Sequence, residues 1–103
     1  MDENTIVTRN ILIKDDHDRV RIQIGHDDAN NQPHFMMFDR NGTPRVILTV
    51  GQDAPKFSLL DDLGTSRVTI HLTAEGEVQI LLLDDQGNPH GSILRPDGTQ
   101  QSF

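Results

Sequence analysis

The chain has 103 residues, the length of one ordinary domain, and it contains no cysteine, tryptophan or tyrosine. Sixteen acidic against nine basic residues give a formal net charge of −7. This composition excludes a disulfide scaffold and a thiolate metal site, and it argues against nucleic acid as a partner because phosphate contacts need clustered lysine and arginine. The longest uninterrupted apolar runs hold four residues, which is far too short for a membrane-spanning helix.

The first candidate element is the stretch Thr5-Ile6-Val7-Thr8, which we expect to form an outer strand. Four similar segments follow it, at residues 11–25, 35–50, 57–72 and 80–94. Each consists of an apolar run, an aspartate, a four-residue turn and a second apolar run. The marker residues Asp15, Asp39, Asp61 and Asp84 are 24, 22 and 23 positions apart, so the chain is an internal repeat.

The turn in each segment follows the pattern D-x-x-[G/D]-x-x-[R/H]. An aspartate in the first position can accept a hydrogen bond from the backbone two residues on, and a glycine three positions later can take the left-handed conformation. Together they predict a type I turn with a glycine bulge, a common hairpin connection. Asp18 takes the place of the glycine in the first copy. Each repeat is therefore predicted to be one β-hairpin.

Short polar joints at 27–33, 52–55 and 74–77 separate the hairpins, and the tail from Arg95 to Phe103 is expected to be a final turn with a frayed end. Thirteen of the 16 acids are aspartate, which favours turns over helix, and the chain has no helical periodicity. We therefore predict a single all-β domain over residues 1–103, with repeats at about 9–31, 33–53, 55–75 and 78–98. It is an antiparallel meander of four tandem hairpins with about eight strands, forming a curled sheet, a barrel or an oligomeric β-prism.

The strands before the turns are apolar on both faces, as in Phe35-Met36-Met37-Phe38, whereas the strands after the turns alternate. Continuous apolarity is typical of a strand that is covered on both sides. A domain of this length has little material for a second covering layer. We therefore expect self-association through a sheet face into a dimer or a trimer, with a further protein partner as a possibility.

The candidate chemistry is sparse. Paired acids such as Asp61-Asp62 could ligate Ca²⁺, but no EF-hand loop is present, so we interpret them as turn residues. The histidines, His17, His26, His34, His71 and His90, lack zinc-ligand spacing; the loop with His26, Asp27, Asp28 and His34 is the best metal candidate among them. The arginines at one repeat position, Arg21, Arg45 and Arg67, could form an anion-binding stripe, but pairing with a turn aspartate is the favoured interpretation.

The repeat resembles tandem D-x-x-G-x-x-R hairpin segments of uncharacterised bacterial proteins, over about 85 residues of this chain. It is also loosely similar to the YD repeats of large bacterial shell-forming toxins, and Phe38-Asp39-Arg40-Asn41-Gly42 is the nearest match. The resemblance implies hairpin architecture and no activity.

We therefore expect a non-enzymatic structural or protein-interaction module that self-assembles through a sheet face. It has no catalytic, cofactor-binding or metal-ligating residues and no nucleic-acid or membrane partner. The alternatives are a small-ligand or metal-binding β-barrel, and an enzyme whose residues converge only in the fold. The acidic start Met1-Asp2-Glu3-Asn4 is unlike a signal peptide, so a cytoplasmic location is expected.

Overall fold

The computed structural model describes residues 2–52 and 54–103. It is all-β, with no helix in these two ranges. The nine strands are β1 (Ile11–Lys14), β2 (Val20–His26), β3 (Pro33–Phe38), β4 (Pro44–Gly51), β5 (Ala54–Leu60), β6 (Ser66–Leu72), β7 (Val78–Leu83), β8 (Pro89–Leu94) and β9 (Gln100–Ser102).

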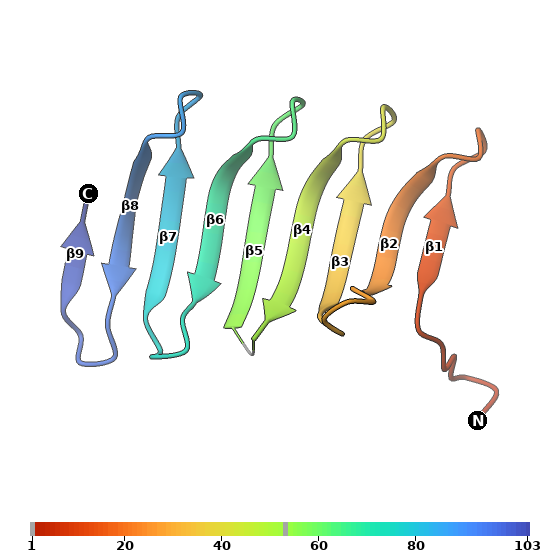
Figure 1. Ribbon diagram of the computed structural model, residues 1–103, viewed down its shortest axis with the longest axis horizontal. Coiled ribbons are helices and arrows are strands. Elements are labelled where there is room, and N and C mark those ends of the chain that lie inside the picture. The colour runs from red at the N-terminus through yellow and green to blue at the C-terminus, as the bar shows by residue number, and fades with distance from the viewer. Residues whose placement is uncertain (1, 53) are drawn as a thin grey trace.

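The strands form one antiparallel meander in which every strand pairs with its neighbours along the chain, from β1 to β9 (Figure 1). The predicted meander and its four hairpins, β1–β2, β3–β4, β5–β6 and β7–β8, are confirmed. The closed barrel is wrong, because β1 and β9 are the two free edges of an open sheet.

The two ends of the chain differ from the prediction. Residues 5–8 form no strand, and β1 begins only at Ile11. The extra strand lies at the other end, where β9 pairs with β8 through Leu94 and Gln100. A backbone hydrogen bond from Phe103 to Gly91 extends this pairing, so the tail is not frayed. Strand pairing at an edge depends on a neighbour's free backbone groups, which a local apolar pattern does not report.

The turns of the four hairpins lie along one edge of the sheet, at the top in Figure 1, and we call this the turn edge. In the second hairpin, Gly42 donates to the carbonyl of Asp39 and has a φ of 84°. Gly64 and Gly87 repeat this geometry, and Asp18 adopts it in the first hairpin with a φ of 65°. The predicted type I turns with a left-handed fourth residue are therefore confirmed.

The same turn also occurs twice on the opposite edge of the sheet, once in the joint after Leu72 and once in the final turn that was expected from Arg95. Gly76 donates to the carbonyl of Thr73, and Gly98 donates to the carbonyl of Arg95. Both glycines have positive φ, 85° and 89°. In both turns a glycine stands three residues after the first turn residue, Thr73 or Arg95, and that first residue is not an aspartate.

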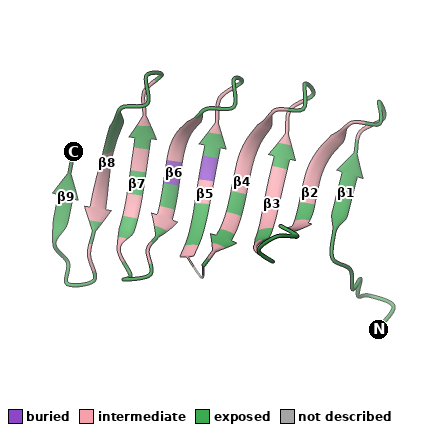
Figure 2. Ribbon diagram, viewed as in Figure 1, coloured by how far each residue is buried: buried purple, intermediate pink, exposed green. Residues whose placement is uncertain are grey.

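The sheet is a single layer, and within the described residues it has no buried hydrophobic side chain (Figure 2). The accessible surface is 7502 Å², whereas a compact monomer of 11.6 kDa exposes about 5,800 Å². The radius of gyration is 16.5 Å, against about 13 Å for a compact chain of this length. The chain therefore exposes about 1,700 Å² more than a compact protein of its mass.

Candidate functional site

The strand register places the apolar residues of β1 to β7 on one side of the sheet. Residues opposite one another in antiparallel strands point to the same face, and residues two apart on a strand share it. Applied to the observed pairs, this rule gives three rows that cross the strands. The turn-side row is Ile13, Ile22, Met37, Val46, Leu59, Val68 and Leu82; the central row is Ile11, Ile24, Phe35, Leu48, Phe57, Ile70 and Ile80; the loop-side row is His26, Pro33, Val50, Pro55, Leu72 and Val78.

We call these three rows the apolar face. Eighteen large hydrophobic residues are exposed in the described chain, and thirteen of them point to this side of the sheet, counting Leu94 on β8. The three rows contain no Asp, Glu, Lys or Arg, and His26 is their one titratable residue. Contiguous apolar patches beyond a few hundred Å² mark interaction sites in soluble proteins. The apolar face is therefore the leading candidate for a functional surface.

The second face of the sheet is more polar. Its middle carries Ser58 and Thr69, which are 7% and 6% exposed and are the most buried residues of the described chain. The same row also contains apolar residues, and these account for the strands that the sequence shows as apolar on both sides: Leu12, Met36, Ile47 and Leu81. Near the turn edge, Phe38 and Leu60 are half-buried on this face. Most of the exposed large hydrophobic residues of the described chain thus lie on one face, although the sequence alone did not distinguish the two.

The apolar face ends at β8 because the fourth hairpin lacks a bulge. In the first three hairpins the register shifts by one residue next to the turn, beside Arg21, Arg45 and Arg67. In the fourth, pairing runs without a shift from Leu83 and Pro89 to Val78 and Leu94. A one-residue change of register moves each side chain to the other face. His90 and Ser92 consequently point to the side of the apolar face and form a polar margin.

Leu48 stands between two hollows in the apolar face. One, of about 260 Å³, is lined by Ile24, Phe35 and Leu48 among others, and the other, of about 350 Å³, by Leu48, Phe57 and Ile70 among others. Leu48 is the middle residue of the central row, because β4 is the fourth of the seven strands that carry the face. Its side chain is 44% exposed.

The turn edge is fixed by aspartates that accept backbone hydrogen bonds. Oδ1 of Asp39 accepts from the amides of Asn41 and Thr43, at 2.9 and 3.1 Å. Asp15, Asp61 and Asp84 make the same pair of contacts in their own turns. The hydrogen bond from the amide two residues after each aspartate was predicted. The hydrogen bond from the amide four residues after it was not predicted.

These contacts lower the pKa values of the turn aspartates. Desolvation raises the pKa of Asp15, but hydrogen bonds from the Arg19 and His17 amides and the Arg19 side chain outweigh it and lower the pKa to about 2. The pKa of Asp39 is lowered chiefly by the Thr43 amide, with further help from Asn41 and Arg45. The aspartates of the turn edge are therefore ionised structural acceptors.

The repeated arginines connect each hairpin to the next one. Nε of Arg21, Arg45 and Arg67 donates to the carbonyl oxygens of Phe38, Leu60 and Leu83, at 2.9, 2.8 and 2.6 Å. The same guanidinium groups lie 3.4, 3.5 and 3.8 Å from a carboxylate oxygen of the aspartate in their own turn. The predicted pairing with a turn aspartate is confirmed, and the contact with the following hairpin is new. We call each such arrangement an arginine clamp.

The histidines do not converge. His26 and His34 lie on opposite faces, because His34 is paired with Gly25 and His26 with Pro33. The loop that was the best metal candidate from sequence is therefore not assembled as one site. Nδ1 of His26 is 3.8 Å from Asp28, an exposed residue. Residues 2–52 and 54–103 contain no group of three or more His, Asp or Glu side chains that could hold a metal ion.

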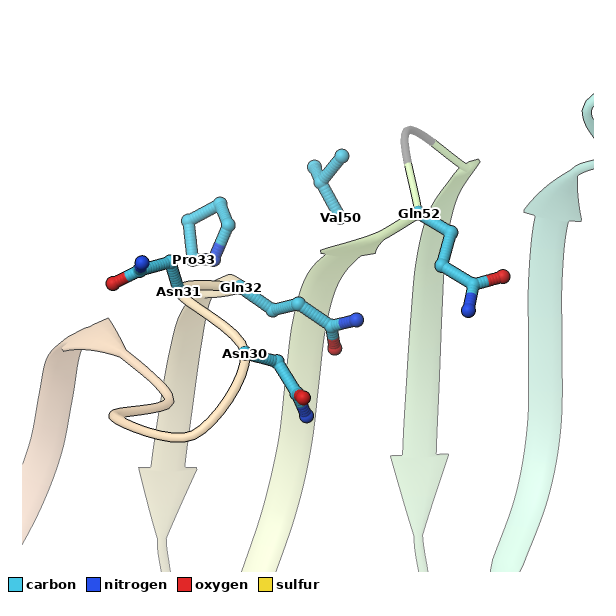
Figure 3. A pocket seen from close by; sticks show the side chains of 6 residues that line it. All are labelled: Asn30, Asn31, Gln32, Pro33, Val50 and Gln52. Atoms are coloured by element: carbon cyan, nitrogen blue, oxygen red, sulfur yellow. The ribbon is translucent and has the colours of Figure 1, made fainter.

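A polar hollow of about 480 Å³ lies at the edge opposite the turn edge, between the β2–β3 loop and the end of β4 (Figure 3). Its polar lining consists of the amides of Asn30, Asn31, Gln32 and Gln52. Figure 3 shows the side chains of Asn30, Gln32 and Gln52 extending to one side, away from those of Pro33 and Val50. Neutral amides can donate and accept hydrogen bonds, but they do not transfer protons at neutral pH.

No protein-family model matches the chain, and comparison with curated proteins finds no significant match. In the part of the chain that the structure describes, no helix has the length and apolarity to cross a membrane.

Proposed function

We propose that the protein is a non-enzymatic structural module that self-assembles through the apolar face into a dimer or a trimer. The observation that carries the proposal is that thirteen of the eighteen exposed large hydrophobic residues of the described chain point to one side of a single-layer sheet, in a chain that exposes about 1,700 Å² more than a compact protein of its mass. A stable protein interface needs about 800 Å² from each partner. The excess exposed surface of the chain is about twice this area.

The chemistry of the face supports another apolar surface as the partner. No Asp, Glu, Lys or Arg of the three rows would lose its hydration on contact, so covering them carries no cost of burying an unpaired charge. Two sheets packed face to face lie about 10 Å apart and bury their inner side chains as the core of a sandwich. A second copy of the chain offers an apolar surface of the same size. A nucleic acid or a charged ligand offers no such apolar surface.

The test is the solution mass by light scattering coupled to size exclusion, for the native chain and two variants. Ile70→Asp places a charge in the central row, and Leu63→Asp places one at a turn tip, where the leucine is 85% exposed. We expect two or three chains for the native protein and for Leu63→Asp, and a shift to 11.6 kDa monomer or to unfolded chain for Ile70→Asp. A native monomer with a folded circular dichroism spectrum would contradict the proposal.

A further inference from the structure

We infer that the second copy lies with its β4 across β4 of the first, so that Leu48 of one chain faces Leu48 of the other. The inference rests on the proposed self-assembly and adds where the partner sits. A contact between two identical faces is isologous and has a twofold axis. A residue faces its own counterpart only where that axis passes over it.

The position of the axis follows from the extent of the apolar face. Two sheets packed face to face are related by an axis that lies in the plane between them. For one copy to cover the whole apolar face of the other, this axis must pass over the centre of the face. The centre is Leu48, in the middle row and on the middle strand of β1 to β7. The two hollows that flank Leu48 give the opposing leucines room to interdigitate.

The polar margin on β8 determines the direction of the axis. An axis along β4 exchanges β1 with β7 and β2 with β6, and it leaves β8 and β9 overhanging the edge of the partner. His90 and Ser92 then stay in water, as the polar rim of an interface does. An axis along the central row would place β8 over β8 and would enclose these polar residues. The axis along β4 brings Ile24 of one copy opposite Ile70 of the other.

The chain lacks cysteine, so single thiols can report this geometry. The variants are Leu48→Cys, Ile24→Cys, Ile70→Cys and the matched control Thr49→Cys, which is next to Leu48 on β4 but points to the second face. Each is treated with a bifunctional maleimide that spans the separation of about 10 Å between packed sheets. The products are counted on a denaturing gel after the mass of each variant has been measured in solution.

We expect Leu48→Cys to give mostly cross-linked pairs and Thr49→Cys to give few. Ile24→Cys and Ile70→Cys should cross-link when mixed and not when each is alone. If Ile24→Cys alone cross-links as well as Leu48→Cys, the axis runs along the central row and the inference is wrong. If Leu48→Cys forms an oligomer by mass but does not cross-link, the partner sits elsewhere, and the proposed function survives. If the native chain is a monomer, the proposed function itself fails.

Discussion

Nε of Arg45 donates a hydrogen bond to the carbonyl oxygen of Leu60, 2.8 Å away and in the following hairpin. The register is shifted beside Arg45, and this bulge leaves the guanidinium next to both the Asp39 carboxylate and the adjoining strand. A hairpin turn and its junction with the next hairpin are thus held by one side chain, and Arg21 and Arg67 repeat the arrangement.

Removing one arginine clamp should weaken the fold. We expect Arg45→Ala to lower the free energy of unfolding by about 1 kcal/mol, because the Leu60 carbonyl and the Asp39 carboxylate lose their partner at a half-exposed site. Urea unfolding at fixed protein concentration measures the change. Arg40→Ala, at an exposed position of the same turn, is the control and should change stability by less than about 0.5 kcal/mol. Equal effects of the two substitutions would contradict the clamp.

The left-handed turn positions predict substitutions of opposite sign. Gly42 has a φ of 84° and open space where a Cβ would be, so Gly42→Ala tests backbone strain alone. We expect a loss of about 1 kcal/mol. Asp18 has a φ of 65° in the equivalent position, and Asp18→Gly should raise stability by up to about 1 kcal/mol. Thermal unfolding of both variants at one protein concentration measures these changes. An increase in stability of Gly42→Ala would contradict the left-handed conformation of residue 42.

Acid should destabilise the protein as the pH falls from about 4 to about 2. The folded pKa of Asp15 is about 2, whereas an unfolded aspartate titrates near 3.9. The unfolded chain therefore binds protons first as the pH falls, and the stability contributed by the ionised carboxylate is lost. The urea concentration at the midpoint of unfolding, measured at each pH from about 4 to about 2, reports this loss of stability. Asp39→Asn should make this loss of stability shallower, because the neutral amide takes up no proton in this range.

The unshifted fourth hairpin predicts a sensitive glycine. A Cβ at Gly91 would collide with the backbone oxygen of Ile80, the residue next to its partner Leu81 on β7. Gly91→Ala should therefore cost about 1–3 kcal/mol by forcing the two strands apart. Gly51→Ala is the control, because the nearest atom there is the flexible end of Gln32, 3.4 Å away. Hydrogen exchange should show reduced protection of the β7 and β8 amides in Gly91→Ala. Native protection of these amides in the variant would contradict the predicted separation of the two strands.

The hairpins were predictable from sequence because their turns are encoded locally. Asp39 and Gly42 are three residues apart, and their side-chain and backbone preferences are enough to specify the turn. The register of the fourth hairpin was not predictable in this way. His90 occupies the repeat position of Arg45, yet it pairs directly with Leu82, and no residue next to it signals that the bulge is missing. Bulges depend on the partner strand, which a linear pattern does not contain.

The candidate surface was predictable in part. The sequence showed strands that are apolar on both faces, and from this it followed that one face needs a cover. Which face carries the exposed area depends on the register shifts beside Arg21, Arg45 and Arg67, because each shift reverses the side chains that follow it. The expectation that His26 and His34 could bind one metal ion was wrong for a related reason. The pairing of their strands points the two side chains to opposite faces of the sheet.

The single-layer meander also has a consequence for cooperativity. Within the described residues, each strand contacts only the strands next to it in the chain, as the units of a linear repeat array do. We expect a single chain of this kind to unfold strand by strand from the free edges β1 and β9, without one cooperative transition for the whole sheet. In the proposed assembly, covering the apolar face joins β1 to β7 through a shared core, so these seven strands should unfold together, whereas β8 and β9 outside the interface should unfold more easily.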